Sequence, residues 1–296
     1  MTVLRAKRLY RTIAVFLGIF VFLGAFLASV MIADMVTERY AHTVPSYDRV
    51  DISALAEKEG EWTEEELHTL YLQTGLGKSA LLEMRTQKVD QYGNKLEPFP
   101  EELKKYQDAL FYEGEITHEH VADVSNRDLL KNPYARVAPV MQAGDVLVNS
   151  STHTLGFRNG HAALVLNEYG DVLESFQIGY NSAASDDAGE WFAASSNFLL
   201  LRLKDVDAQM RSDIAENALH TLSGIPYTLT VGIFSKKYQG ERPKGTQCAH
   251  LVWQAFKNAG YDVDSNRGIV VTPRDIARSP LFEVVQVYGF DPEKLW

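Results

Sequence analysis

The sequence predicts an α+β domain attached to a single N-terminal transmembrane helix. Three observations support this prediction: an uncharged apolar run over residues 12–33, a series of short β-rich runs from Gly144 onward, and a few helical runs between those strands. Strands that interleave unevenly with helices are typical of an α+β arrangement rather than of regular βαβ units. A chain of 296 residues is long enough for one enzyme-sized core with additional segments.

The composition is that of a globular protein, and it excludes two classes. A hydrophobic fraction of 46% excludes a wholly disordered chain. The formal net charge of −10 excludes a nucleic-acid partner, because binding to a polyanion requires clustered lysine and arginine. The only dense basic cluster lies in residues 5–11, directly before the apolar run.

The apolar run over residues 12–33 contains no charged residue and ends at Asp34. Such a length spans a bilayer. Because basic residues stay on the cytoplasmic side, we expect residues 1–11 to form a cytoplasmic tail and the rest of the chain to lie outside. A cleaved signal peptide, which would give a secreted protein, is the alternative. The long run and the lack of a small-x-small site favour an uncleaved anchor in the cell membrane.

Residues 34–136 are predicted to form a helical membrane-proximal region. Thr63 and Glu66 have the spacing of a capping box, which indicates a helix start. Pro100 begins a second helix, from Glu101 to Phe111. The sequence leaves open whether this region inhibits the following domain, positions it or merely tethers it. It also leaves open the oligomeric state, since small residues in the anchor are compatible with helix pairing and with lipid contact.

Residues 137–296 are predicted to form the α+β domain. Period-2 and β-branched runs indicate strands at residues 145–148, 161–166, 171–176, 197–203 and 283–288. One helix is expected over residues 205–222. A second is expected to begin at Cys248 and to end before Gly260.

Cys248 is the single cysteine, so the chain can form no intramolecular disulfide. It stands at the predicted start of a helix, where exposed backbone amides and the positive end of the helix dipole stabilise a thiolate. A structural role is the alternative. Cys248 is also the first member of an apolar helical stripe that continues with Leu251, Val252, Ala255, Phe256 and Ala259.

His161 is the best-placed base for a Cys248 nucleophile, because it opens an apolar strand and so stands on a rigid element. The turn at residues 167–170 is predicted to join this strand to the strand that carries Glu174. A two-residue loop places His161 opposite Glu174, and a four-residue loop makes them diagonal neighbours on one face. In either register Glu174 can accept a hydrogen bond from the imidazole. A three-residue loop puts them on opposite faces and leaves Glu174 as a solvated carboxylate.

Three other histidines are weaker candidates for the base. His250 lies two residues beyond Cys248, on the far side of the same predicted helix. His153 is predicted to lie in a surface loop, with a place in the lining of a substrate cleft as the alternative. His220 belongs to the preceding helix and is expected to be partly exposed.

Tyr227 is a candidate for polarising a substrate carbonyl beside the backbone amide of Cys248, with a packed aromatic ring as the alternative. No metal site is predicted. His118 and His120 are read as part of a solvated loop, because the His-Glu-x-x-His spacing is absent.

Several short motifs occur in an order that resembles the NlpC family of papain-like cysteine hydrolases, and more closely its circularly permuted YiiX/YebB-like branch. In that branch the catalytic histidine precedes the cysteine. The similarity covers about residues 140–290. The motifs are Gly144-Asp145-Val146-Leu147, Gly160-His161-Ala162-Ala163, Glu174, Pro226-Tyr227 and Gln247-Cys248-Ala249-His250-Leu251-Val252-Trp253.

The resemblance implies a circularly permuted papain-like fold, with an antiparallel sheet and the nucleophile at a helix N-terminus. It implies Cys248 as nucleophile, His161 as base and Glu174 as the orienting residue, with no cofactor and no metal. The implied reaction is amide or ester hydrolysis through an acyl-enzyme, commonly on peptidoglycan peptides. Two alternatives are a lipid acyltransferase or thioesterase, like the lecithin:retinol acyltransferase relatives, and a non-catalytic wall-binding module.

Overall fold

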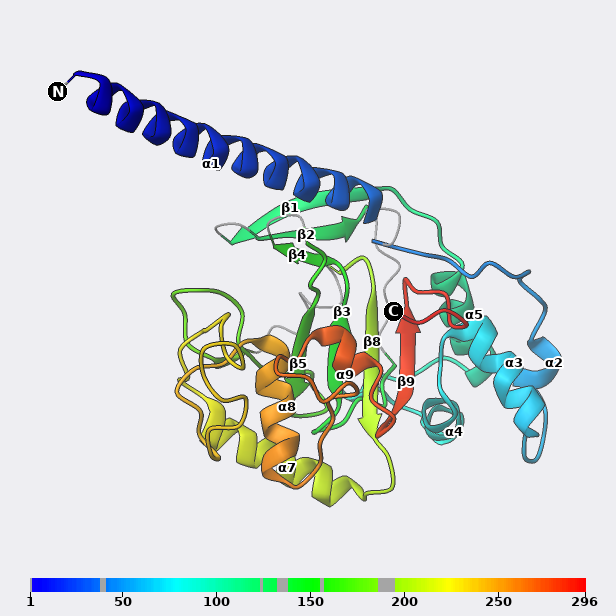
Figure 1. Cartoon of the computed structure of the whole chain (residues 1–296). Helices are drawn as coiled ribbons and strands as arrows, with labels where there is room; N and C mark the ends of the chain where they lie inside the picture. The colour runs from blue at the N-terminus through cyan, green and yellow to red at the C-terminus, as the bar shows by residue number, and fades with distance from the viewer. Residues whose placement is uncertain (1, 38–40, 123–124, 132–137, 155–156, 186–194) are drawn as a thin grey trace.

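The computed structural model describes residues 2–37, 41–122, 125–131, 138–154, 157–185 and 195–296. Figure 1 shows a long N-terminal helix that leads into a body of mixed helices and sheets. In chain order the elements are α1 (Thr2–Thr37), α2 (Ser53–Ala56), α3 (Glu64–Thr74), α4 (Lys78–Thr86), α5 (Phe99–Leu110), β1 (Ile116–Ala122), β2 (Ser125–Leu130), β3 (Val146–Asn149), β4 (Thr152–Thr154), β5 (His161–Val165), β6 (Val172–Glu174), β7 (Ala183–Ser185), β8 (Phe198–Leu203), α7 (Ala208–Leu222), α8 (Cys248–Asn258), α9 (Pro273–Ala277) and β9 (Phe282–Tyr288).

A six-stranded sheet forms the centre of the body, with the strand order β7-β6-β5-β3-β8-β9. Every pairing in it is antiparallel. The predicted α+β class is therefore confirmed, and the predicted strands correspond to β3, β5, β6, β8 and β9 with ends shifted by a few residues.

Helices pack on both faces of this sheet. Side chains alternate between the two faces along each strand, so neighbouring residues of one strand contact different helices. In β3, Leu147 packs in a core with Leu70 of α3 and Leu103 of α5. Its neighbour Val148 packs in a second core, with side chains of α7 and α8 that include Phe256. The strands are buried on both sides, which explains their nearly continuous apolar sequences.

The N-terminal helices α3 to α5 belong to this body rather than forming a separate stalk. The predicted capping box of α3 is confirmed: the Glu66 amide donates to Thr63 Oγ1 at 3.2 Å, and the Thr63 amide donates to Glu66 Oε2 at 2.7 Å. Gly77, directly before α4, lies very close to β9. A Cβ at this position would lie 1.7 Å from the Val284 carbonyl oxygen. The chain thus needs glycine where this helix meets the sheet edge.

A second, three-stranded antiparallel sheet has the order β1-β2-β4. The sequence predicted only helices in residues 34–136, so the prediction is wrong for residues 116–122 and 125–130. It failed because this hairpin has polar residues on both faces and lacks the apolar alternation that indicates a strand. The expectation of a solvated loop at His118 and His120 is half right: both residues are exposed, but they lie in the strand β1 and not in a loop.

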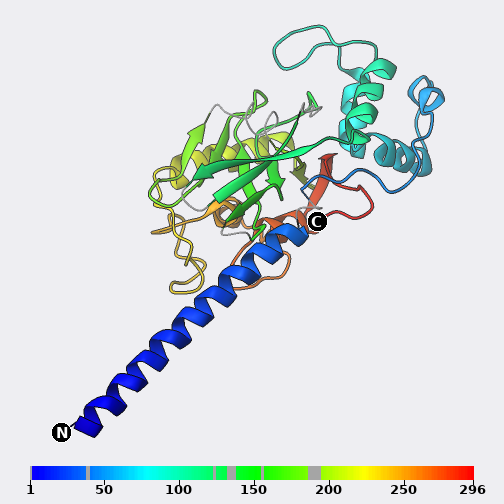
Figure 2. The ribbon, with the colours of Figure 1, turned by 90° about the horizontal axis from the view of Figure 1, so that it is seen from above.

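Helix α1 contains the segment Tyr10–Ala33, which is long and apolar enough to cross a membrane; a signal sequence meets the same criteria. Its predicted boundaries, residues 12–33, fall within this segment. Figure 2 shows α1 projecting away from the body. Near its C-terminal end the ring of Phe26 lies 6.5 Å from that of Phe157, so the last turns of the helix approach the body.

The chain after α1 is tied to the ends of β8 and β9. The Ala41 carbonyl accepts hydrogen bonds from the side chains of Ser196 and Asn197, both at 2.5 Å. The Thr43 amide donates to the Gly289 carbonyl at 2.9 Å. The body is therefore fastened directly beyond the end of α1.

A buried ion pair joins β8 to the residue that precedes β3. Arg202 of β8 donates from Nε and Nη2 to the two carboxylate oxygens of Asp145, both at 2.8 Å. It also donates to the Val140 carbonyl at 2.6 Å and to Glu83 of α4 at 2.9 Å. Burial raises the pKa of Asp145, against the lowering effect of the Arg202 hydrogen bonds and charge. This network joins the central strands to the N-terminal helices.

Candidate active site

His161 and Glu174 lie on neighbouring strands of a hairpin. Leu164 pairs with Leu173 across β5 and β6, and the Leu166 amide donates to the Asp171 carbonyl at 2.7 Å. This register leaves a four-residue loop at residues 167–170. Of the registers that the sequence left open, it is the one that makes His161 and Glu174 diagonal neighbours on one face.

The two side chains are in direct contact. His161 Nε2 lies 2.6 Å from Glu174 Oε2. Both side chains are largely shielded, with exposed fractions of 8% for His161 and 17% for Glu174. The ring of Phe176 stands edge-on to the imidazole, with 5.7 Å between centroids. Contact with a carboxylate and an aromatic ring restricts the imidazole to one orientation.

Cys248 is the first residue of α8, as predicted, and it is 95% buried. Gln247 caps this helix: its Oε1 accepts from the Ala249 amide at 3.0 Å and from Cys248 Sγ at 3.4 Å. Its Nε2 donates to the Val271 carbonyl at 2.6 Å. No role was predicted for Gln247, because glutamine is not among the residues that usually cap a helix N-terminus.

His161 links the other two side chains, because it contacts Glu174 and lies close enough to Cys248 for the thiol to affect its pKa. Burial by itself lowers the pKa of His161, but the hydrogen bonds and charges of Cys248 and Glu174 outweigh it and raise the pKa to about 10. With Glu174 on Nε2, Nδ1 is the nitrogen available to the sulfur. The structure therefore brings together the three residues that the sequence selected for catalysis.

Tyr227 lies beside this cluster. Tyr227 forms a parallel bridge with Thr246, the residue before the helix cap Gln247. In this bridge the Thr228 amide donates to the Thr246 carbonyl at 2.7 Å, and the Thr246 amide donates to the Pro226 carbonyl at 3.0 Å. Burial and, secondarily, the charge of Cys248 raise the pKa of Tyr227 far above its ordinary value. Its phenol is therefore protonated at neutral pH, which is the form that can donate a hydrogen bond.

Gly160 fixes the entry of the chain into β5. Its φ of +70° lies in the left-handed region, and an added Cβ would lie 2.3 Å from both the Asn149 carbonyl and the indole of Trp296. A residue with a side chain would be strained and would collide with both neighbours. The position of His161 thus depends on a glycine immediately before it.

The three other candidate histidines have polar partners other than Cys248. His250 is buried, with Nδ1 at 2.9 Å from Thr246 Oγ1 and Nε2 at 2.9 Å from the Lys237 carbonyl. Burial lowers its pKa to about 4, so it is a neutral structural residue. His220 is exposed on α7, as expected. The expectation of a surface loop was wrong for His153, which is buried in β4.

Comparison with known proteins gives little further identification. No protein-family model matches the chain, and no curated protein sequence matches it. Among solved structures, the chain is similar to the metalloprotein yiiX from Escherichia coli O157:H7, with a TM-score of 0.38 and 15% sequence identity. That similarity covers 49% of this chain and 96% of the other.

Proposed function

We propose that this protein is a membrane-anchored cysteine hydrolase of the circularly permuted papain-like type. The observation that carries the proposal is the contact of His161 with both Glu174 and Cys248, at the N-terminus of α8. A buried nucleophile, a base and a residue that orients the base are the three parts required for covalent acyl transfer. The order of histidine before cysteine in the chain fits the permuted arrangement.

In the proposed reaction the Cys248 thiolate attacks the carbonyl carbon of an amide or ester, and the carbonyl electron pair moves to oxygen. The imidazolium of His161 protonates the leaving amine or alcohol as its bond to the carbonyl carbon breaks, which leaves an acyl-thioester. Neutral His161 then takes a proton from water, the hydroxide attacks the thioester, and the thiolate leaves. The products are a carboxylic acid and an amine or alcohol.

The other residues have supporting roles in this proposal. Glu174 holds the imidazole in place and stabilises its charged form, consistent with the raised pKa of His161. The backbone amide of Cys248 and the protonated phenol of Tyr227 are donors for the developing oxyanion. Neither role requires a metal or an organic cofactor.

The proposed substrate is a peptidoglycan peptide or another amide outside the cytoplasm. The basic residues before the apolar segment of α1 favour a cytoplasmic N-terminus, which places the body on the outer side. A lipid ester or thioester is a second candidate, and the approach of Phe157 to Phe26 in α1 favours it because it keeps the body close to the bilayer.

The test uses the full-length chain in detergent micelles with two substrates, purified muropeptides and phospholipid vesicles. Cleavage of muropeptides alone supports a peptidase. Cleavage of phospholipid alone contradicts the peptidase and supports a lipid acyltransferase or thioesterase. We expect His161→Ala to lower the rate by about 10²–10⁴-fold and Cys248→Ser to abolish the thioester intermediate.

A thiol-reactive electrophile provides a test that needs no substrate. We expect Cys248 to react faster than free cysteine at neutral pH, and His161→Ala to remove this advantage. His220→Ala is the matched control, because this histidine is exposed on α7. Reactivity no greater than that of free cysteine and insensitive to His161→Ala would leave the wall-binding module as the better reading.

A further inference from the structure

The small sheet brings together three side chains that are far apart in the sequence. His118 of β1 pairs directly with Asp128 of β2, and His153 of β4 pairs with Asn126 of the same strand. Asn126 and Asp128 are two residues apart and therefore face the same side. One face of the sheet thus carries two imidazoles and a carboxylate from three adjacent strands.

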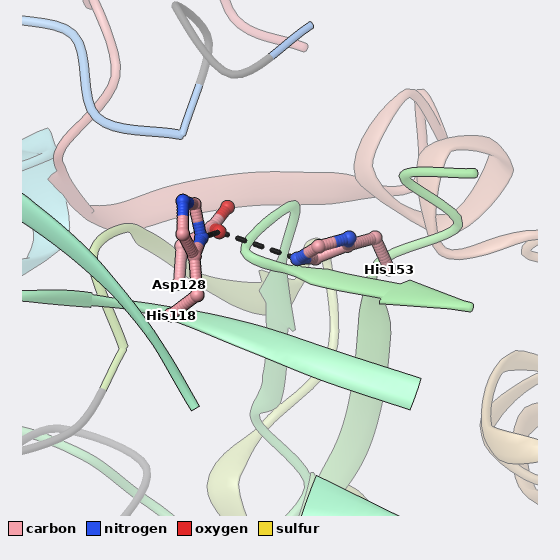
Figure 3. A group of neighbouring side chains, drawn as sticks. All are labelled: His118, Asp128 and His153. Atoms are coloured by element: carbon pink, nitrogen blue, oxygen red, sulfur yellow. Dashed lines mark hydrogen bonds and ion pairs between the residues drawn. The ribbon is translucent and has the colours of Figure 1, made fainter. Parts of the chain in front are cut away.

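The three side chains converge on a single oxygen atom. His118 Nδ1 lies 2.8 Å from Asp128 Oδ1, and His153 Nε2 lies 3.3 Å from the same oxygen. One potential ligand atom from each residue lies within 4.8 Å of the others. Figure 3 shows the His118 and His153 side chains meeting the Asp128 carboxylate.

The surroundings hold the carboxylate firmly and leave one side of the cluster accessible. Asp128 is fully buried and His153 is 2% exposed, whereas the side chain of His118 is 47% exposed. Arg158 forms an ion pair with Oδ2 of Asp128, which turns Oδ1 toward the imidazoles. The backbone of Asp128 is bonded on both sides, from its amide to Ser151 and from Ser196 to its carbonyl.

We propose that His118, Asp128 and His153 form a binding site for a divalent transition-metal ion, with zinc as its simplest occupant. Two imidazoles and one carboxylate suit zinc and the neighbouring first-row metals. The exposed side at His118 leaves a fourth position for water. Arg158 acts as the hydrogen-bonded support that metal-binding carboxylates usually have.

Metal binding replaces the hydrogen bonds that now join the imidazoles to Oδ1. Each imidazole becomes a ligand through a nitrogen lone pair, so any proton on that nitrogen is released on binding. The positive charge of Arg158 opposes the cation, and we expect only moderate affinity. The site shares no residue with the proposed active site and lies in the other sheet, so the two proposals can fail independently.

The experiment measures metal binding by the full-length chain in detergent, in a Cys248→Ser background that removes the competing thiol. After treatment with EDTA and dialysis, zinc chloride is titrated by calorimetry and cobalt chloride by visible absorption. We expect one equivalent of zinc per chain, and a cobalt spectrum of nitrogen and oxygen ligands without thiolate charge transfer.

His118→Ala is the decisive variant, because this half-exposed residue can be changed with little effect on packing. We expect it to weaken zinc binding by about tenfold or more. His120→Ala is the matched control: this residue lies on the same strand, two positions further, and contacts Asn126 Oδ1 at 3.2 Å. Its zinc affinity should equal that of the parent chain. His118→Gln serves as a second variant, with circular dichroism to verify the fold.

Either of two results would overturn the assignment. One is the absence of stoichiometric zinc binding by the parent chain. The other is an affinity of folded His118→Ala or His118→Gln equal to that of His120→Ala. In both cases the cluster is an ion-pair network centred on Asp128 and Arg158.

Discussion

The imidazole of His161 has two polar neighbours that both favour its charged form. Because its pKa in the folded protein is about 10, above the ordinary value of 6.5, the imidazolium contributes stability that is fully present below pH 6.5. This contribution is lost as the pH rises through about 10. Each unit of pKa elevation corresponds to about 1.4 kcal/mol.

We therefore predict that the difference in melting temperature between the parent chain and His161→Gln shrinks as the pH rises from 7 to 10.5. Thermal denaturation followed by circular dichroism measures it. His250→Gln is the control, because the lowered pKa of His250 keeps it neutral throughout this range. A difference for His161→Gln that stays constant with pH would contradict the charged imidazole.

The sequence predicted the cluster of Cys248, His161 and Glu174, but it did not predict the cluster around Asp128. Cys248, His161 and Glu174 could be selected because a helix start and a two-strand hairpin each have a recognisable local pattern. The meeting of His118 with His153 depends on the pairing of β2 with β4, which connects residues on either side of β3. No local pattern encodes that pairing.

The strand β5 depends on the glycine that precedes it. We predict that Gly160→Ala destabilises the protein and lowers the rate of Cys248 alkylation, because the new methyl group must displace the Asn149 carbonyl or the Trp296 ring. The expected cost in stability is about 1–3 kcal/mol for a strained backbone position. Chemical denaturation and the alkylation rate measure the two effects.

Gly179→Ala is the control for backbone conformation alone. This glycine also has a positive φ, of +88°, but nothing lies within 4 Å of an added Cβ. It should lose stability through strain and leave the alkylation rate unchanged. Equal alkylation rates in the two variants would show that Gly160 does not position His161.

Five strands of the large sheet (β3, β5, β6, β8 and β9) and the helices α3, α5, α7 and α8 followed from periodicity and capping, whereas β7 was not predicted. Bounds were less accurate: the helix expected from residue 205 begins at Ala208, because Asp207 is its cap and accepts from the Met210 amide at 2.8 Å. Strands β1 and β2 were missed because their face buries a carboxylate with an arginine and a histidine instead of apolar side chains.

At the scale of the whole molecule, the buried pair of Arg202 and Asp145, extended by Glu83, joins the large sheet to the N-terminal helices. We predict that Asp145→Ala lowers the free energy of unfolding by about 3–5 kcal/mol, because it leaves a buried guanidinium without its main counter-charge. Urea denaturation in detergent measures this loss. Glu83→Gln is the control, since Glu83 is 39% exposed and its pair with Arg202 contributes about 1 kcal/mol or less.

The orientation of the whole chain in a membrane can be tested with introduced cysteines in the Cys248→Ser background. Phe234 is 87% exposed on the body, so Phe234→Cys should react with a membrane-impermeant maleimide on intact cells. Arg5→Cys, before the apolar segment, should react only after the cells are permeabilised. The opposite pattern would place the body in the cytoplasm.

The fastening of Ala41 and Thr43 to β8 and β9 limits how far the body can travel from the bilayer. Between the end of α1 at Thr37 and Ala41 there are four residue steps, which span at most about 14 Å. With α1 in a membrane, the connection between the membrane and the body is therefore short. The protein searches a thin layer beside the membrane in two dimensions, and a substrate must come within that layer to be reached.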